Sequence, residues 1–391
     1  MSKKKYSKRI YGRGGFTLIE LLIGSTIMVV VILATLTLYM RSNKLAVDQQ
    51  QFAELQHDVR AGMFFITRDV RSAGVGLTPD IAGYFIEGKD AFSPNPEAAD
   101  SIKIVGNFDD PLSLRIEKYQ GGGGGGAATA FLYDWELENA PYDCPDFYEN
   151  RLVLIISTKC PGCFAFRYIP QNSVHGCGSG TAHINMQPGQ SELNPPGGLS
   201  SKLCPPDCWD DAILTYGQIK QYWLDTTGTP GDYPDLNLAV GQKGYLGIPY
   251  TLYLTTISES GGITHLPLAQ NIENLQFQYN GDFNNDGLLD GFRDWDNTYW
   301  TVFPEDDEPT KEAKLELISR IGQVRILVLG RTENPFVSFS GTPPANIHLY
   351  RRPALANSPQ SNQDDMHRRF LLESTSTIRN LNLNLYNFGE R

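Results

Sequence analysis

An apolar run dominates the start of the chain. It begins at Phe16 and continues to Met40, and Glu20 is the only side chain within it that we expect to be charged. As a helix rising about 1.5 Å per residue, 16–40 spans about 37 Å, which exceeds the roughly 30 Å core of a bilayer. The pattern therefore predicts a membrane-spanning helix.

A second helical pattern follows the apolar run without an intervening proline. Its apolar residues recur at spacings of three, four or seven and form one stripe among polar neighbours: Leu45, Phe52, Leu55, Val59, Met63, Ile66, Val70 and Ala73. We expect an amphipathic helix over 41–76 that stops at Gly74-Val75-Gly76. Joined to the apolar run, it makes one long N-terminal helix over 16–76.

Short β-branched and aromatic runs bounded by turn residues predict a β-rich head over 77–391. The expected strands are Ser101–Val105, Leu112–Lys118, Arg151–Ser157, Phe164–Ile169, Tyr250–Thr256, Leu275–Tyr279, Gln323–Leu329 and Arg369–Glu373. Long Gly-, Pro- and Asn-rich stretches separate them at 75–100, 170–211 and 225–248. The expected class is α+β, with a long N-terminal helix packed on the head.

Basic residues precede the apolar run, and no acidic residue accompanies them: Lys3, Lys4, Lys5, Lys8, Arg9 and Arg13. This bias predicts a cytoplasmic N-terminus and an exported head. The run is too long for a secretory signal peptide and ends without a small-residue cleavage site. A plain signal anchor leaves Glu20 unexplained, because a carboxylate costs about 2.5–3.5 kcal/mol at a helix centre.

A cut between Gly15 and Phe16 would explain Glu20, because the new amino group on a neighbouring copy could pair with its carboxylate. The sequence Gly-Phe-Thr-Leu-Ile-Glu-Leu at 15–21 resembles the prepilin N-terminus of type IV pilins and type II secretion pseudopilins. The resemblance implies that a membrane peptidase removes the leader 1–15 and N-methylates Phe16. It also implies that Glu20 registers subunits, with 16–40 in the filament core.

Further segments resemble the PilW-type minor pilins, namely 49–56, 68–74, 271–279, 320–329 and 368–372. The resemblance implies a type IV pilin-like fold and a part in initiating or capping pilus assembly. The implied partners are other minor and major pilins, the prepilin peptidase and the inner-membrane assembly platform. The implied location is the bacterial inner membrane as a single-pass protein, then the periplasm and an extracellular pilus. The cysteine-rich middle, about 120–250, has no such resemblance, and we interpret it as an insertion into the head.

Two other functions stay open at this point. One is a type II secretion pseudopilin similar to the J component, although those heads are smaller. The other is a pilus-tip adhesin, whose ligand site would use aromatic residues of the insertion, namely Tyr142, Phe147, Tyr148, Trp209, Tyr222 and Trp223. Aromatic residues on strands more often belong to a hydrophobic core than to a sugar-binding surface.

Acidic residues outnumber basic ones, 44 to 33, and the formal net charge is −11. Removing the six basic residues of the leader would leave −17. Because nucleic-acid binding needs a basic surface, we expect no nucleic-acid partner.

Six cysteines lie after the apolar run, on the side predicted to be exported: Cys144, Cys160, Cys163, Cys177, Cys204 and Cys208. An even count in an oxidising compartment predicts disulfides, at least two of a possible three, with the connectivity open. The pair Cys160 and Cys163 also fits a redox CxxC, and with Cys204 and Cys208 it could bind zinc. No thioredoxin-like pattern supports the redox alternative.

An acidic loop follows the expected strand at 275–279. Oxygen side chains at alternate positions, then a glycine, can wrap a hard cation such as Ca²⁺; the candidate ligands are Asp282, Asn284, Asp286, the Leu288 carbonyl, Asp290 and Asp294. Arg293 stands where an EF-hand has its bidentate glutamate, so Asp294 would close the site. The alternative is a solvated hairpin turn.

The sequence has no G-x-S-x-G motif, no HExxH motif and no phosphate-loop lysine, and we expect no enzyme. The six histidines are scattered singly. His175 and His183 are therefore interpreted as ordinary loop residues and not as metal ligands.

Overall fold

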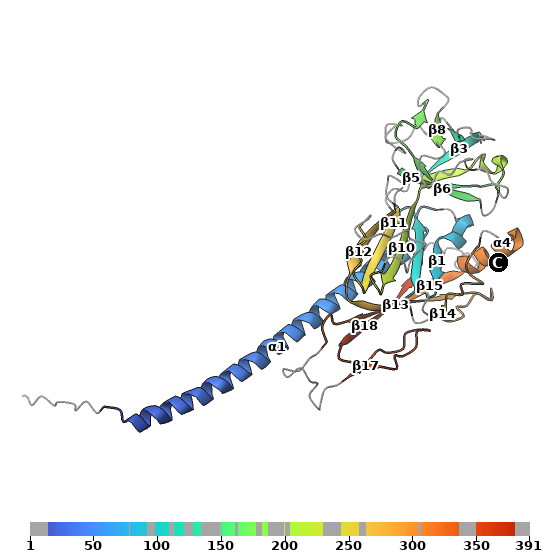
Figure 1. The fold of residues 1–391 in the computed structure, drawn as a ribbon. Coiled ribbons are helices and arrows are strands. Elements are labelled where there is room, and N and C mark those ends of the chain that lie inside the picture. The colour runs from blue at the N-terminus through green and yellow to red at the C-terminus, as the bar shows by residue number, and fades with distance from the viewer. Residues whose placement is uncertain are drawn as a thin grey trace, which may run out of the picture. The chain divides into compact units, whose positions relative to one another are not determined.

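The computed structural model describes residues 15–77, 79–91, 98–108, 113–120, 128–133, 149, 151–160, 163–176, 182–186, 199, 204–229, 244–257, 263–303, 306–335 and 349–379. The chain divides into two units, Met1–Ala53 and Glu54–Arg391. Helix α1, Leu18–Arg71, begins in the first unit and ends in the second (Figure 1). The two units are described separately below.

The first unit contains the apolar part of α1, and its side chains are exposed. Phe16 is 88% exposed and Leu18 82% exposed, and Met40 is still 40% exposed. The most apolar window of this helix has no buried residue. Within the described residues, α1 is the single helix that is long and apolar enough to cross a membrane, as the hydrophobic pattern predicted.

In the second unit, α1 is part of the hydrophobic core. The predicted stripe is confirmed over this part, because its apolar residues are at most 6% exposed: Leu55, Val59, Met63, Ile66 and Val70. A Cβ added to Gly330 would lie 2.5 Å from Leu55 Cδ1 and 2.6 Å from Val59 Cγ2. Glycine at this strand position therefore lets the helix approach the sheet closely.

The helix ends near the predicted stop. Gly74 has a φ of +72°, a conformation that glycine adopts without strain. Its N–H donates to the carbonyl of Val105 at 2.8 Å. A Cβ at this position would lie 2.1 Å from the Phe85 ring, so only glycine fits.

Two antiparallel sheets accompany this part of α1. The five-stranded sheet has the order β1-β2-β10-β11-β12, with bounds Ile86–Lys89, Ser101–Gly106, Gln218–Asp225, Thr251–Ile257 and Ile263–Ala269. The four-stranded sheet has the order β14-β13-β15-β18, with bounds Arg293–Asp294, Ile272–Gly281, Ile321–Arg331 and Arg369–Thr377. Most of these strands are labelled in Figure 1.

A seven-stranded sheet has its own hydrophobic core around Trp209. Its order is β6-β5-β9-β3-β4-β8-β7, with bounds Phe164–Ile169, Arg151–Ile156, Ile213–Tyr216, Ser113–Gln120, Ala128–Leu132, His183–Met186 and Val174–His175. A two-stranded sheet pairs β16, Tyr350–Arg351, with β17, Asp364–Asp365. The described residues include two short 3₁₀ helices, η1 at Pro79–Tyr84 and η2 at Pro206–Trp209.

All eight predicted strands occur, with ends shifted by a few residues. The region interpreted as one insertion, about 120–250, is divided between two sheets, because β10 lies at the centre of the five-stranded sheet. Helix α4, Glu308–Ser319, was not predicted. Asp307 caps it by accepting from the Thr310 N–H at 3.1 Å, and the aspartate–proline signal at its start was overlooked.

A buried charge network joins α1 to β10. Asp69 is 2% exposed, and its carboxylate contacts Arg68 Nε at 2.8 Å, Lys220 Nζ at 3.1 Å and the Tyr222 hydroxyl at 2.6 Å. Burial disfavours the charged carboxylate, but the hydrogen bonds from Arg68 and Tyr222 and the charge of Lys220 outweigh it, and the pKa of Asp69 is lowered.

Replacing Asp69 with asparagine should destabilise the folded head by about 3–5 kcal/mol, because the ammonium of Lys220, whose side chain is 14% exposed, loses its counter-charge. Because the pKa of Asp69 is lowered on folding, its contribution is complete above about pH 4, the unfolded value, and is lost as the pH falls through the folded value. Denaturant unfolding of the full chain in detergent, followed by tryptophan fluorescence, measures both effects.

The control is Asp58→Asn, on the same helix, where the carboxylate is 31% exposed. This variant should change the free energy of unfolding far less. An Asp69→Asn variant that matches the control, or that keeps the acid dependence of the wild type, would contradict this role for Asp69.

Candidate functional site

The prepilin-like segment lies at the start of α1. Gly15 and Phe16 precede the helix, and a Cβ on Gly15 would meet nothing within 4 Å. Phe16 is 88% exposed. Within the first unit, the Gly15–Phe16 peptide bond therefore lies in non-helical backbone open to another molecule.

Glu20 closes the first turn of α1 together with Thr17. The Thr17 N–H and hydroxyl each donate to Glu20 Oε2 at 2.9 Å, and the Glu20 N–H donates to Thr17 Oγ1 at 3.3 Å. This reciprocal pair is a capping box, which satisfies backbone donors at the helix start. The carboxylate predicted to register subunits thus has a local role within a single chain.

The acidic loop folds back on itself between β13 and β14. The Asp290 N–H donates to the Gly281 carbonyl at 3.0 Å and closes the base of the loop. Gly287 has a φ of +85° and its Cβ position is open, so glycine is needed there for backbone conformation alone. The predicted sharp turn at this glycine is present.

The predicted ligands organise this loop through backbone amides. Asp282, 5% exposed, accepts from the N–H groups of Asp286 at 2.9 Å and Gly287 at 2.8 Å. Asn284 Oδ1 also accepts from Asp286, and Asp286 Oδ1 accepts from Leu288 at 2.8 Å. A carboxylate has about four lone-pair sites, so Asp282 and Asp286 can accept further bonds.

The carboxylates of Asp290 and Asp294 have partners of their own. Asp290 Oδ2 accepts from the N–H groups of Phe283 at 2.8 Å and Asn284 at 3.2 Å, and Arg293 lies 3.9 Å away. Asp294 Oδ1 accepts from Gln278 Nε2 at 3.0 Å, across the β13–β14 pair. No group of three or more His, Cys, Asp or Glu side chains in the described ranges is placed to hold a metal ion. A cation here would rely on neutral oxygens too.

Four of the six cysteines form two disulfides. Cys160 pairs with Cys208 and Cys163 with Cys204, with Cα–Cα distances of 5.4 and 5.7 Å. Two disulfides, as predicted, are therefore present. The redox CxxC and zinc alternatives are wrong for these cysteines, because each sulfur of the CxxC is bonded to a cysteine in or near η2. Cys144 and Cys177 lie outside the described residues.

The aromatic residues proposed for a tip adhesin are partly in the core. Trp209, Tyr222 and Trp223 are at most 1% exposed, and Tyr222 donates to Asp69. They cannot stack on a ligand without unfolding their surroundings. Tyr142, Phe147 and Tyr148 lie outside the described residues.

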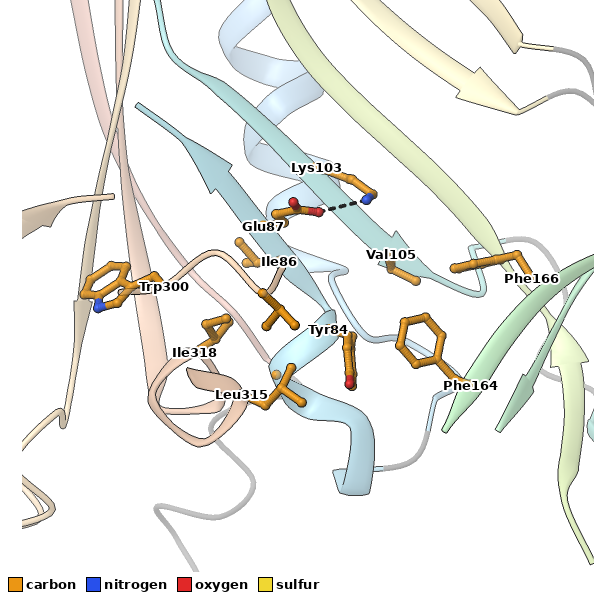
Figure 2. A pocket seen from close by; sticks show the side chains of 12 residues that line it. Tyr84, Ile86, Glu87, Lys103, Val105, Phe164, Phe166, Trp300, Leu315 and Ile318 are labelled. Atoms are coloured by element: carbon orange, nitrogen blue, oxygen red, sulfur yellow. Dashed lines mark hydrogen bonds and ion pairs between the residues drawn. The ribbon is translucent and has the colours of Figure 1, made fainter. Parts of the chain in front are cut away.

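A different cavity, of about 330 Å³, lies between β1, β2, η1, α4 and β6. Figure 2 shows Tyr84 and Phe164 facing each other on one side, with ring centroids 4.1 Å apart. The Lys103 ammonium and the Glu87 carboxylate form an ion pair at 2.8 Å, and the remaining lining is mostly apolar. Sequence reasoning missed this cavity because its residues are far apart in the chain and carry no motif.

The architecture that emerges is α+β: a long N-terminal helix, apolar at its start, whose last turns pack into a β-rich head with two disulfides. Neither a comparison with protein-family models nor one with curated proteins gave a match. Among solved structures, the chain is similar to a type IV-like pilin from Thermus thermophilus. The identity is 12%, the TM-score is 0.19, and the match covers 42% of this chain and 78% of that one.

Proposed function

We propose that this chain is a type IV pilus minor pilin resembling the PilW family, with a non-enzymatic part in initiating or capping assembly. The observation that carries the proposal is the exposed apolar surface of α1 between Phe16 and Met40. Apolar surface of this extent needs a bilayer or neighbouring helices to cover it. In a pilin this surface is covered first by the bilayer of the inner membrane and then by neighbouring helices in the filament.

The open backbone at Gly15 and Phe16 supports processing at this bond. A peptidase must bind its scissile peptide in an extended form, and residues outside a helix meet that requirement without unfolding. In this proposal the leader 1–15 keeps the N-terminus cytoplasmic, and its removal leaves an amino group on Phe16. The partners are the prepilin peptidase, the inner-membrane platform and other major and minor pilins.

Glu20 has two successive partners in this proposal. Before assembly the carboxylate accepts from Thr17 in the capping box. During assembly the amino group of Phe16 on a neighbouring copy approaches it, and a full positive charge is a stronger partner than a hydroxyl in apolar surroundings. The capping box therefore keeps the carboxylate satisfied until a subunit docks.

A pseudopilin would have the same leader cleavage and N-methylation as a minor pilin. The phenotype of a deletion strain therefore distinguishes the two functions. Loss of the gene would remove surface pili in one case and block export of secreted hydrolases in the other. For the adhesin alternative, three of the six aromatic candidates, Trp209, Tyr222 and Trp223, are buried in the core and cannot contact a ligand. The cavity beside Tyr84 and Phe164 is the place where the described part of the head could take a small ligand.

We also propose that the acidic loop binds Ca²⁺ and rigidifies the surface between β13 and β14. All the donors are oxygens, which Ca²⁺ prefers: Asp282, Asn284, Asp286, the Leu288 carbonyl, Asp290 and Asp294. Four aspartates lie close together in the sequence of this loop, and a cation would offset their negative charge. Because some of these ligands are neutral oxygens, we expect a Ca²⁺ dissociation constant in the range of weak extracellular sites, about 10⁻⁴–10⁻³ M.

The mature protein should begin with N-methylated Phe16. Mass spectrometry of the protein isolated from its own membrane fraction measures this terminus. A Gly15→Val variant should keep the leader, because a bulky side chain occupies the position before the cut. The matched variant Gly14→Ala should be processed normally. An intact Met1 or Ser2 terminus in the wild type would leave a fixed membrane anchor and remove the basis of the filament proposal.

A Glu20→Gln variant should still be cleaved at Gly15, yet be absent from filaments sheared off the cell surface. The amide keeps a hydrogen-bond acceptor for Thr17 but cannot neutralise the neighbouring ammonium group. Immunoblots of the membrane and sheared fractions give the ratio, which should fall by at least about tenfold, equivalent to about 1.4 kcal/mol. Equal incorporation of the variant and the wild type would show that the charge of Glu20 is dispensable.

Ca²⁺ should bind the purified chain and raise its unfolding temperature, with Mg²⁺ much weaker. The Asp286→Asn variant removes one exposed carboxylate from the proposed ligand set and should weaken binding by at least about tenfold. The control Asp296→Asn changes a neighbouring aspartate that caps a turn through Thr298 and Tyr299 but lies outside the set. Titration calorimetry that finds no Ca²⁺ heat at millimolar concentration, or the same loss in both variants, would exclude the site.

A further inference from the structure

Two histidines that are eight residues apart in the chain face each other across a strand pair. Strand β7 is the edge of the seven-stranded sheet, and β8 is its neighbour. The pair is antiparallel, and His175 lies directly opposite His183 in the register. Directly opposed residues of an antiparallel pair place their Cβ atoms about 4.5–5.5 Å apart on the same face of the sheet.

The imidazole rings are correspondingly close. Their centroids are 5.4 Å apart, with an interplanar angle of 41°. His175 is exposed and His183 is half-exposed. The rings are therefore adjacent on an accessible face, and neither ring is enclosed in the core.

Packing on the opposite face fixes which way the two rings point. Val174 is 8% exposed and Ile184 is fully buried, and these residues are also directly opposed in the register. Because side chains alternate along a strand, burying Val174 and Ile184 turns both histidines outward. Strand β8 is held on its other side by β4, where Phe131 pairs with His183 and its ring lies 5.6 Å from the imidazole.

This arrangement suits chelation by imidazole nitrogens. A transition-metal ion lies about 2.0–2.1 Å from a ligating nitrogen, hence about 3 Å from the ring centre, so rings this close can reach one ion. Imidazole is a good ligand for Cu²⁺, Ni²⁺ and Zn²⁺ and a poor one for Ca²⁺ and Mg²⁺. The pair thus differs in chemistry from the oxygen-rich loop at Asp282.

We propose that His175 and His183 together bind a divalent transition-metal ion on the outer face of the seven-stranded sheet. In the part of the chain that the structure describes, no third His, Cys, Asp or Glu is placed to join them. Such a site has an open position and an affinity that follows the order Cu²⁺ above Ni²⁺ and Zn²⁺. The bound ion would clamp the two-residue strand β7 to β8.

The register and packing of β7 and β8 support this site whether or not the chain is a pilin. The structure also corrects the interpretation of His175 and His183 as loop residues. Both belong to strands, and their contact follows from the antiparallel register of β7 and β8 and not from their spacing in the sequence.

The test is metal binding by the untagged full chain in detergent, using Cu²⁺, Ni²⁺ and Zn²⁺ salts as the probes. The wild type should bind one Cu²⁺, and electron paramagnetic resonance should show two nitrogen ligands. His175→Gln and His183→Gln should each weaken Cu²⁺ binding by at least about tenfold, and the double variant should be no weaker than either, because one imidazole alone cannot chelate.

The matched control is His57→Gln, which changes a single histidine whose side chain is 85% exposed on α1. It should leave Cu²⁺ affinity and stoichiometry unchanged. Circular dichroism confirms that the variants fold, and His175→Gln is informative even if His183→Gln is destabilised, because His175 is exposed. Wild-type affinity in His175→Gln, a signal with one nitrogen ligand, or an equal loss in His57→Gln would overturn the proposal.

Discussion

The close approach of α1 to the sheets is the constraint on which the head depends. The stripe from Leu55 to Val70 is buried, and Gly330 leaves room for the Leu55 and Val59 side chains. Gly62 allows a similar approach to Leu252. Tight packing of this kind makes the helix part of the core of the second unit, so the head has no complete core without the end of α1.

Near the C-terminal end of the buried stripe, charged side chains also hold α1 against the sheet. Asp69 is buried beside Lys220 and Tyr222, and its lowered pKa shows that the folded state favours the charged form. A buried ion pair adds little net stability over an apolar pair, yet breaking it is costly. The network joins α1 to β10, so these contacts form only when the helix is rotated with Asp69 toward β10.

The head combines two kinds of local reinforcement in its irregular regions. Disulfides tie the turn between β5 and β6 to η2, and aspartate side chains hold the loop after β13 through backbone amides. The disulfides stabilise by covalent closure, and the aspartates stabilise by satisfying backbone donors. The proposed ions would act in the same way, at the acidic loop and at the β7–β8 edge.

The sequence alone determined those features that depend on residues close together in the chain. The apolar run, the stripe of α1 and the eight strands follow from periodicity, which depends only on neighbours along the chain. The cysteine pairing, the place of β10, the cavity beside Tyr84 and the opposition of His175 and His183 needed the tertiary structure. They depend on strand register and on which surfaces pack together, and contacts between distant residues leave no periodic trace in the sequence.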